Sequence, residues 1–195
     1  MLSLEGVVEP SAESEAAHAA DFVARLRAGE LDAIAEAYDA HHAALCSFAK
    51  RLLGDQHAAE DLVQDVFVVL PSVAHRFAPP ASLRSFLLGI ASNRAKHHGR
   101  SRLRLQSFFQ RLVYEPAEEV ETPERLTERQ LLATLLARAL DTLPLEHRTT
   151  FVLKEIEGYS AKEVGDILDI PEATVRTRLF HARARLRTFL DGGAR

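Results

Sequence analysis

Residues 158–189 constrain the fold of this 195-residue chain more than any other stretch. Ser160 and Glu163 form a capping box, which begins a helix by supplying hydrogen-bond acceptors to backbone N–H groups of the first turn. Pro171 ends that helix and begins another, since its fixed φ suits a first helical turn. The sequence therefore predicts two helices that meet across a tight turn.

The second of these helices is amphipathic and strongly basic. Its apolar residues recur at helical spacing and form a narrow seam of Val175, Leu179, Ala182, Leu186 and Phe189. Its arginines lie off the seam and are Arg176, Arg178, Arg183, Arg185 and Arg187. Alone, such a basic face is most simply a solvated surface. Together with the capped first helix and the turn, it favours a helix-turn-helix, whose second helix contacts base edges while arginines contact phosphates.

The overall charge limits how the chain can bind nucleic acid. It has 24 Lys and Arg residues against 28 Asp and Glu residues, which gives a formal net charge of -4. A protein that coats nucleic acid without selectivity needs excess positive charge, so any DNA contact must come from local basic clusters. With 47% hydrophobic residues, the chain can build one moderate domain or two small ones.

The single cysteine, Cys46, excludes an intrachain disulfide and a thiolate metal cage. The N-terminal residues lack the basic start of a secretory signal, and the longest strongly apolar run, residues 66–70, is too short to span a bilayer. We therefore expect a cytoplasmic protein with no membrane insertion.

The first half of the chain predicts a helical domain over residues 21–113. Residues 1–20 are acidic and rich in Ala and Ser, and we expect them to form a mobile tail. Apolar spacing and glycine stops predict helices near residues 22–29, 31–54 and 57–70. On the third helix Asp61, Gln64 and Asp65 share the edge opposite the apolar face, where the residues alone suggest a solvated surface.

A proline-containing loop and a basic helix follow. Pro79 and Pro80 exclude a helix over residues 77–82, and Ser82 is the expected cap of the next helix. That helix turns strongly basic from Arg94 to Arg104, with no acidic residue in this run. A basic helix end can simply complement the helix dipole. The number of cations nevertheless favours a second nucleic-acid surface.

The sequence leaves open whether residues 105–113 continue this helix or belong to a linker. Residues 114–128 are acidic and punctuated by proline, which predicts a flexible, extended linker. Beyond it, apolar spacing predicts helices over residues 131–140 and 144–156. No stretch shows the alternation of a β-strand. We therefore predict an all-α protein with two small helical domains, 21–113 and 129–195, of which the second is a helix-turn-helix.

No constellation of residues indicates catalysis. The paired histidines, at 41–42 and 97–98, would point about 100° apart on a helix and cannot chelate one ion as an i, i+4 pair could. No HExxH motif, glycine-rich phosphate loop or nucleophile elbow is present. Cys46 lies among apolar residues and is most simply a packing residue. The residues predict a DNA-binding protein that is not an enzyme and needs no metal or cofactor.

Three motifs carry a resemblance to a known family. They are AEDLVQDVF at residues 59–67, FAPPASLRSFLLGIASN at 77–93, and LPLEHRTTFVLKEIEGYSAKEVGDILDIPEATVRTRLFHARARLR at 143–187. Their order and spacing, with an acidic linker before the third, resemble a bacterial RNA polymerase sigma factor of the two-domain extracytoplasmic-function (ECF) group. The resemblance implies that the first domain binds the clamp of core RNA polymerase and melts the promoter. It implies that the second domain binds the upstream promoter element and touches the polymerase flap.

The resemblance assigns roles to residues of the first domain. Asp61, Gln64 and Asp65 match the family's polymerase contact, in which carboxylates can meet arginines of the clamp. Residues 77–82 match a loop that captures a base flipped from the non-template strand, with Pro79 and Pro80 where the family usually has polar or acidic residues. The residues implied to hold the melted strand are Phe77, Ser82, Ser85, Phe86, Asn93, Arg94, Lys96, His97 and Arg100.

In the second domain, the resemblance implies DNA contacts from the recognition helix. The matching residues are Glu172, Ala173, Thr174, Arg176, Thr177, Arg178 and Arg183. Core RNA polymerase and promoter DNA are the expected partners, together with an anti-sigma factor that holds the chain until a stress or envelope signal releases it. An alternative is a dimeric helix-turn-helix regulator with an N-terminal sensing domain, which would bind palindromic duplex without polymerase. A histidine-based hydrolase is a third, weaker alternative.

Overall fold

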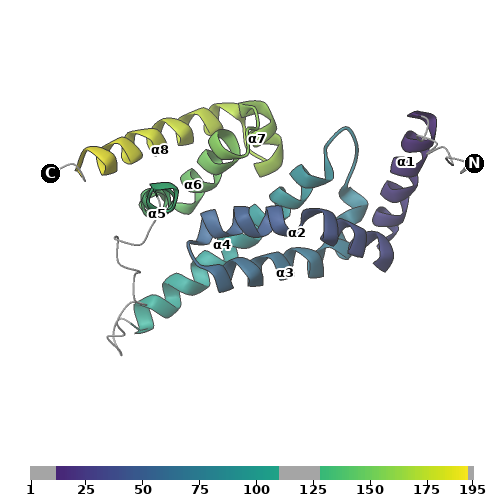
Figure 1. Ribbon diagram of the computed structural model, residues 1–195, viewed down its shortest axis with the longest axis horizontal. Helices are drawn as coiled ribbons and strands as arrows, with labels where there is room; N and C mark the ends of the chain where they lie inside the picture. The colour runs from purple at the N-terminus through teal and green to yellow at the C-terminus, as the bar shows by residue number, and fades with distance from the viewer. Residues whose placement is uncertain (1–11, 110–127, 193–195) are drawn as a thin grey trace, which may run out of the picture.

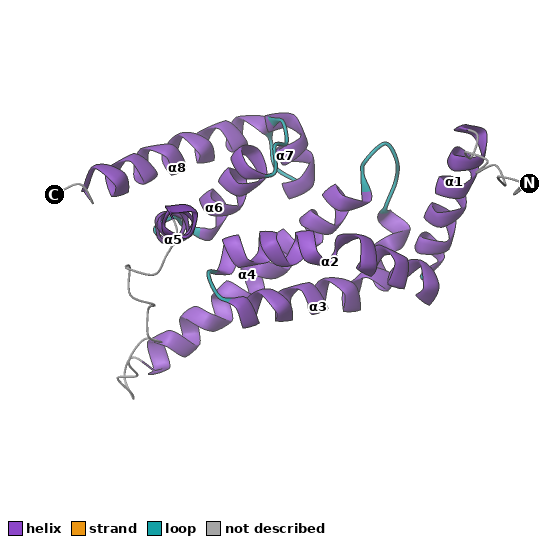
Figure 2. Cartoon of the chain, in the orientation of Figure 1, coloured by secondary structure: helices purple, strands orange, loops and turns teal. Residues whose placement is uncertain are grey.

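The structure is a computed structural model, and it describes residues 12–109 and 128–192. Within these ranges all long elements are helices and no β-strand occurs, which confirms the predicted all-α class (Figure 2). None of the helices described is both long and apolar enough to cross a membrane. The helices form a first domain of α1–α4 and a second of α5–α8 (Figure 1).

Three helices of the first domain lie side by side. They are α2 (Leu31–Leu53), α3 (Gln56–Val73) and α4 (Leu83–Phe109), and α1 (Ala12–Ala28) lies across one end (Figure 1). Gly54 ends α2 in the left-handed conformation, with φ 72°. Asp55 then caps α3, since its side chain accepts a 2.7 Å hydrogen bond from the Ala58 N–H. Together they make the short reversal that lets α2 and α3 pack against each other.

Helix α1 begins earlier than the sequence predicts. The composition of residues 1–20 predicts a mobile tail, but α1 already begins at Ala12. The expectation is wrong for residues 12–20 because missing apolar periodicity does not prevent a helix where Ala and Glu, both strong helix formers, predominate. The helix is anchored near its C-terminal end by Leu26, which is fully buried. Residues 1–11 lie outside the described residues.

The sequence leaves open whether residues 105–113 are helix or linker, and the extent of α4 decides this for part of the segment. It runs to Phe109, so residues 105–109 continue the helix. Residues 110–127, which include most of the predicted acidic linker, lie outside the described residues. The predicted loop is present at residues 77–82, between a 3-10 turn at Ala74–Arg76 and the start of α4.

The second domain contains the expected helix-turn-helix. Its elements are α5 (Glu128–Asp141), α6 (Leu145–Phe151) with a π-helical continuation (Val152–Ile156), α7 (Ala161–Leu168) and α8 (Glu172–Gly192). The predicted capping box begins α7: Ser160 Oγ accepts from the Glu163 N–H at 3.2 Å, and the Glu163 carboxylate accepts from the Ser160 N–H at 2.7 Å. A Cβ on Gly165 would lie 2.8 Å from the Ile170 carbonyl oxygen, so the tight turn after α7 requires glycine there.

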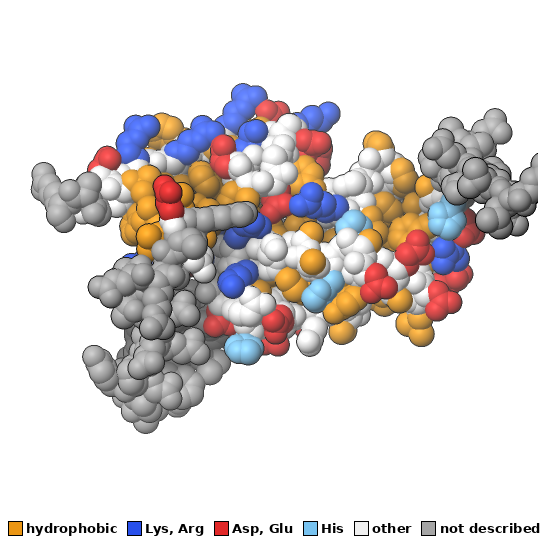
Figure 3. Space-filling model, in the orientation of Figure 1, with side chains coloured by type: hydrophobic (Ala, Val, Ile, Leu, Met, Phe, Trp, Pro, Cys, Tyr) orange, Lys and Arg blue, Asp and Glu red, His pale blue; other side chains and the backbone are white. Residues whose placement is uncertain are grey.

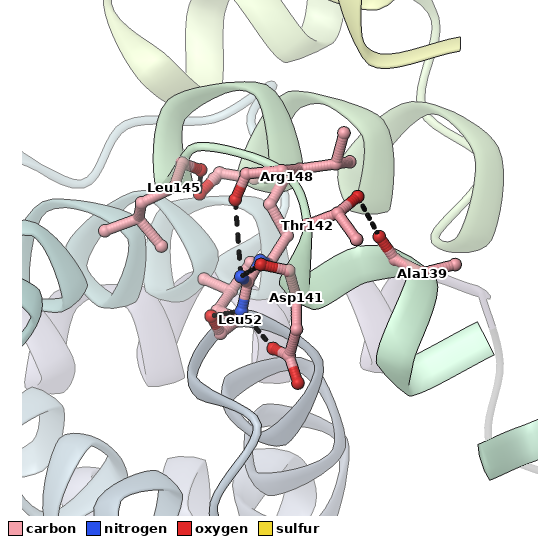
Figure 4. Close-up of polar contacts among 8 residues, drawn as sticks. Leu52, Ala139, Asp141, Thr142, Leu145 and Arg148 are labelled. Carbon is pink, nitrogen blue, oxygen red and sulfur yellow. Dashed lines mark hydrogen bonds and ion pairs between the residues drawn. The ribbon is translucent and has the colours of Figure 1, made fainter. Parts of the chain in front are cut away.

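The two domains pack against each other, whereas the sequence predicts only that a linker joins them. Helices α2 and α4 contact α5, α6 and α7. Figure 4 shows Arg148, on α6, reaching the end of α2. Its guanidinium donates to the Leu52 carbonyl oxygen at 2.7 Å and to the Asp141 carboxylate at 2.8 Å. The surfaces described next therefore belong to one packed unit.

Candidate nucleic-acid and protein interfaces

One side of α3 gathers the three residues expected to contact polymerase. Asp61, Gln64 and Asp65 lie at i, i+3 and i+4, so they are neighbours on the helix surface. Asp61 and Gln64 are exposed and Asp65 is half-buried. The other side of α3 is anchored in the core by residues that are fully buried, namely Leu62, Val63, Val66 and Leu70.

Val68 extends this surface, although the sequence does not indicate that its side chain is exposed. It lies at i+7 from Asp61 and is 77% exposed, whereas Val66 and Leu70 beside it are buried. Within the apolar run 66–70 nothing distinguishes it from its neighbours. Single exposed apolar residues are common on protein surfaces, so Val68 is grouped with the three polar residues only because it lies on the same side of α3. We call Asp61, Gln64, Asp65 and Val68 the α3 face.

The structure corrects the role expected for Phe77. This residue is only 3% exposed, and its ring centroid lies 5.5 Å from that of Phe86. A base cannot stack on a ring that the core already covers, so Phe77 instead holds the loop against α4. Ser82 begins α4 as expected, because its Oγ accepts from the Ser85 N–H at 3.1 Å.

Most residues expected to hold the melted strand line one hollow of about 1000 Å³. They are Ser82, Ser85, Phe86, Asn93, Arg94 and His97. Lys96 lies beside them, with its Nζ 3.2 Å from Asn93 Oδ1. Arg100 belongs to the part of α4 whose side chains lie outside the description. A hollow of this size has room for an extruded nucleotide.

The opposite wall of the hollow belongs to the second domain. It is formed by Tyr159, Glu163, Asp166, Ile167 and Asp169. Burial is the main cause of the raised pKa of the Tyr159 phenol, which also forms a hydrogen bond with the Ser82 side chain. The hollow therefore has a basic wall on α4 and an acidic wall on α7 and its turn.

The exposed side of α8 contains part of the expected DNA contact. Ala173, Arg176 and Thr177 are exposed, and Glu172 and Thr174 are half-buried. Arg176 pairs with the Glu172 carboxylate at 2.6 Å, yet its side chain stays 73% exposed. The Thr177 hydroxyl donates to the Ala173 carbonyl oxygen at 3.0 Å. Figure 3 shows basic side chains, coloured blue, along this helix, and the sequence of α8 makes them arginines.

Two of the expected DNA-binding arginines pair with glutamates of the same domain. Arg178 Nη2 lies 2.5 Å from the Glu146 carboxylate, and its side chain is only 18% exposed. Arg183 lies 2.6 Å from the Glu155 carboxylate but is 59% exposed. Arg178 therefore helps to pack α8 onto α6, whereas Arg183 remains on the surface.

Exposed apolar residues on α8 and α5 are further candidate contact residues, and the sequence does not indicate that they are exposed. Phe180 is 70% exposed and lies at i+3 from Thr177, where an aromatic ring can contact a thymine methyl group.

On α5, the exposed apolar residues are Leu131, Leu132, Leu135 and Leu136. Their helical spacing would equally suit a buried face, so only the position of α5 at the edge of the domain reveals that they are uncovered. Such clusters commonly mark protein contact sites.

The described residues contain no cluster of His, Cys, Asp and Glu that could hold a metal ion. Cys46 Sγ lies 3.5 Å from His42 Nε2, and burial raises the pKa of the thiol. A raised pKa disfavours the reactive thiolate at neutral pH. Cys46 is therefore a packing residue of α2.

Two family models match the chain, one in each domain. Residues 37–105 match Sigma-70 region 2, and residues 133–186 match Sigma-70, region 4. The first match contains the α3 face and the α4 wall of the hollow. The second contains α7 and the exposed start of α8.

The curated relatives that the chain matches are also sigma factors. The ECF RNA polymerase sigma factor SigE of Mycolicibacterium smegmatis is 37% identical over 145 residues, which cover 73% of this chain and 55% of that protein. The ECF RNA polymerase sigma factor SigL of Mycobacterium tuberculosis is 34% identical over 161 residues, which cover 79% of this chain and 86% of that protein. The chain thus spans little more than half of the first relative and most of the second.

Two solved structures share the fold. The sigma factor RpoE from Bartonella quintana, in complex with the anti-sigma factor NepR, has a TM-score of 0.62 at 24% identity, covering 80% of this chain and 95% of that one. CnrH, in complex with the cytosolic domain of CnrY, has a TM-score of 0.61 at 23% identity, covering 88% and 96%. By its two region matches and its similarity to SigL, the chain belongs to the ECF RNA polymerase sigma factors.

Proposed function

We propose that the chain is a dissociable subunit that binds core RNA polymerase, selects promoters and helps to melt them. The observation that supports this role is the presence of separate surfaces on one ECF-family chain: the protein-facing α3 face, the hollow along α4 and the exposed side of α8. A duplex-binding regulator would need only the last of these. This role places the chain in the cytoplasm, where polymerase and promoter DNA are found.

The α3 face is the proposed contact with core polymerase. Asp61 can accept charge-assisted hydrogen bonds, and Gln64 can form neutral ones. Val68 adds apolar area between these two residues and the end of the helix. None of these side chains is needed for the core of the domain, since the buried side of α3 is formed by other residues. Substitutions here should therefore change binding without changing the fold.

The first prediction tests this contact. We expect Asp61→Ala and Gln64→Ala each to lower the affinity for core polymerase by about tenfold, since one lost charged or polar contact costs roughly 1–2 kcal/mol. Binding should be measured by fluorescence anisotropy with labelled full-length chain. Asp39→Ala, an exposed carboxylate on α2, is the charge-matched control. Core affinity that is unchanged in Asp61→Ala and Gln64→Ala would refute the assignment of the α3 face.

The two DNA surfaces are proposed to bind different forms of the promoter. The exposed side of α8, with Arg176 and Thr177, faces outward as a recognition helix must to enter the major groove of the upstream element. The hollow along α4, with Arg94 and Asn93, is proposed to take up the melted strand. Extruding a base costs a few kcal/mol, which stacking and polar contacts within such a hollow can offset.

We also propose that an anti-sigma factor regulates the chain for a stress or envelope-response regulon. One of the solved structures that share this fold is a sigma factor bound to an anti-sigma factor. If the proposal is right, chain purified from unstressed cells will carry a stoichiometric partner that prevents binding to core polymerase. Recovery of a chain that is free and fully able to bind core would contradict it.

A further inference from the structure

Two histidines of the second domain meet where α6 packs against α8. His147 lies on α6 and is half-buried, whereas His181 lies on α8 and is exposed. Their ring centroids are 5.9 Å apart and their ring planes differ by 15°, which is a stacked arrangement. The chain has nine histidines, and these two are the only ones in residues 129–195. The fold therefore brings together both imidazoles of the domain that carries the helix-turn-helix.

The stacked pair borders the exposed side of α8. His181 lies at i+4 from Thr177, so the two side chains are neighbours on the helix surface. The ring of Phe180, which is also exposed, lies edge-to-face with that of His181, with centroids 5.5 Å apart. A duplex held by Arg176 and Thr177 would therefore bring its phosphates close to the exposed imidazole.

The surroundings of the pair oppose its protonation in the free chain. Burial is the main cause of the lowered pKa of His147. The positive charge of a protonated His181 lowers that pKa further, and so do the guanidinium groups of Arg178 and Arg185. Glu146 acts in the opposite direction, but its carboxylate is paired with Arg178 at 2.5 Å. His147 therefore stays neutral at pH values where an unperturbed imidazole is partly charged.

Several acidic groups on the neighbouring elements are engaged elsewhere. Asp141 of α5 pairs with Arg148, and Glu155 of the π-helical stretch pairs with Arg183. Glu157 pairs with arginines of α2 and α4, and the acidic residues of α7 and its turn line the hollow along α4. Within the described residues, Glu146 is therefore the acidic group that acts on His147.

A bound duplex reverses the preference for neutral imidazoles. Each phosphate carries a negative charge, and a negative charge within about 4–6 Å favours the protonated form of histidine. The pKa of the pair is then higher in the complex than in the free chain, so protons are taken up on binding. This contribution to affinity is fully present below the free-state pKa and is lost as the pH rises through the pKa of the complex.

We propose that the stacked pair of His147 and His181 couples binding of the upstream duplex to proton uptake, so that the chain binds this duplex more tightly as the pH falls. The inference rests on the role of α8 in the proposed function and adds a dependence on pH to it. The guanidinium of Arg176 cannot supply this dependence, because arginine stays charged throughout the range in which histidine titrates.

Duplex affinity at two pH values tests the coupling. The probe is a short labelled duplex that the full-length chain enriches from a random-sequence pool at neutral pH. Fluorescence anisotropy at constant ionic strength should show an affinity about tenfold higher near pH 5.5 than near pH 7.5, the change that one pKa unit at one group produces. Calorimetry in two buffers of different ionisation enthalpy should show net proton uptake on binding.

Neutral substitutions should remove the pH dependence. His147→Gln and His181→Gln should each lower the affinity ratio between the two pH values, and the double variant should bind almost equally at both. His181→Lys, whose charge is permanent, should also remove most of the dependence. His57→Gln is the matched control, since this exposed histidine at the start of α3 lies in the other domain. It should keep the tenfold ratio.

An NMR titration of the wild-type chain makes the test independent of how the variants fold. His147 should titrate below the ordinary histidine value in the free chain and at a higher pH in the duplex complex. An unchanged His147 pKa on duplex binding, equal wild-type affinities at the two pH values, or a tenfold ratio that survives in the double variant would overturn the inference. Failure of the proposed function is distinguishable, because then no duplex would be enriched from the pool.

Discussion

Arg176 and Arg178 stand close together on α8, but the structure gives them different contacts. The Arg176 side chain is 73% exposed, whereas that of Arg178 is 18% exposed and paired with Glu146. We expect Arg176→Ala to weaken upstream-duplex binding and to lower the salt slope by about one unit, because one phosphate contact is lost. Arg178→Ala should mainly destabilise the second domain. Anisotropy titrations at several salt concentrations and urea unfolding separate the two effects, and equal salt slopes for both variants would contradict this assignment.

The loss of Arg148 should lower the stability of the chain markedly. Its guanidinium bonds to Leu52, Asp141 and Leu143, so truncation leaves several carbonyl and carboxylate oxygens without a donor. We expect Arg148→Ala to lower the free energy of unfolding by about 2–4 kcal/mol, measured by urea denaturation of the full chain. Arg138→Ala on α5, an exposed position, is the control. A loss no larger than that of the control would refute the stabilising role of these hydrogen bonds.

For single residues, the sequence predicts a role most accurately when that role depends on residues nearby in the chain. The capping box of Ser160 and Glu163 can be identified because it is complete within four positions. Phe77 and Val68 are assigned less well, since the burial of Phe77 depends on Phe86 and the exposure of Val68 depends on which helices cover α3. The resemblance of the motifs assigns the site residues, but only the packing of the helices determines which of them are accessible.

At the scale of elements, α7 depends on its capping box. Hydrogen bonds from the Ser160 side chain and backbone lower the pKa of the Glu163 carboxyl. A lowered pKa in the folded state means that this carboxylate stabilises α7 above its ordinary pKa, and that the stabilisation is lost as the pH falls through the lowered value. We expect Ser160→Ala to return the pKa toward its ordinary value and to lower the thermal midpoint by a few degrees. NMR titration and thermal unfolding check both effects.

Ser160→Asp is the control for this prediction, because aspartate is an equally good N-cap residue. It should keep the thermal midpoint within about a degree of that of the wild-type chain. If Ser160→Ala leaves both the midpoint and the Glu163 pKa unchanged, the capping box does not stabilise α7.

Helix boundaries were predictable where the chain carries a local stop signal. Gly54 with Asp55 and Pro171 mark ends that the structure confirms. The start of α1 was not predictable from periodicity, because residues 17–20 are exposed and carry no apolar face. The exposure of the α5 leucines was also hidden, since an amphipathic pattern states that a helix has an apolar side but not whether anything covers it.

At the scale of the whole molecule, the sequence predicts two all-α domains but not their contact. The pairs that join them are distant in the chain: Arg84 and Glu157 are 73 positions apart, and Arg148 and Leu52 are 96 positions apart. No local pattern encodes such pairs. These pairs also join separate domains, so a binding partner can break them without unfolding either domain.

The role of the chain in promoter selection can be tested by in vitro transcription from genomic fragments, with core RNA polymerase and purified full-length chain, followed by mapping of transcript start sites. Discrete start sites should appear only when the chain is added to core, and they should be largely lost when Asp61→Ala and Gln64→Ala are combined. A chain that leaves the start sites of core polymerase unchanged, and instead binds palindromic duplex by itself as a dimer, would contradict it.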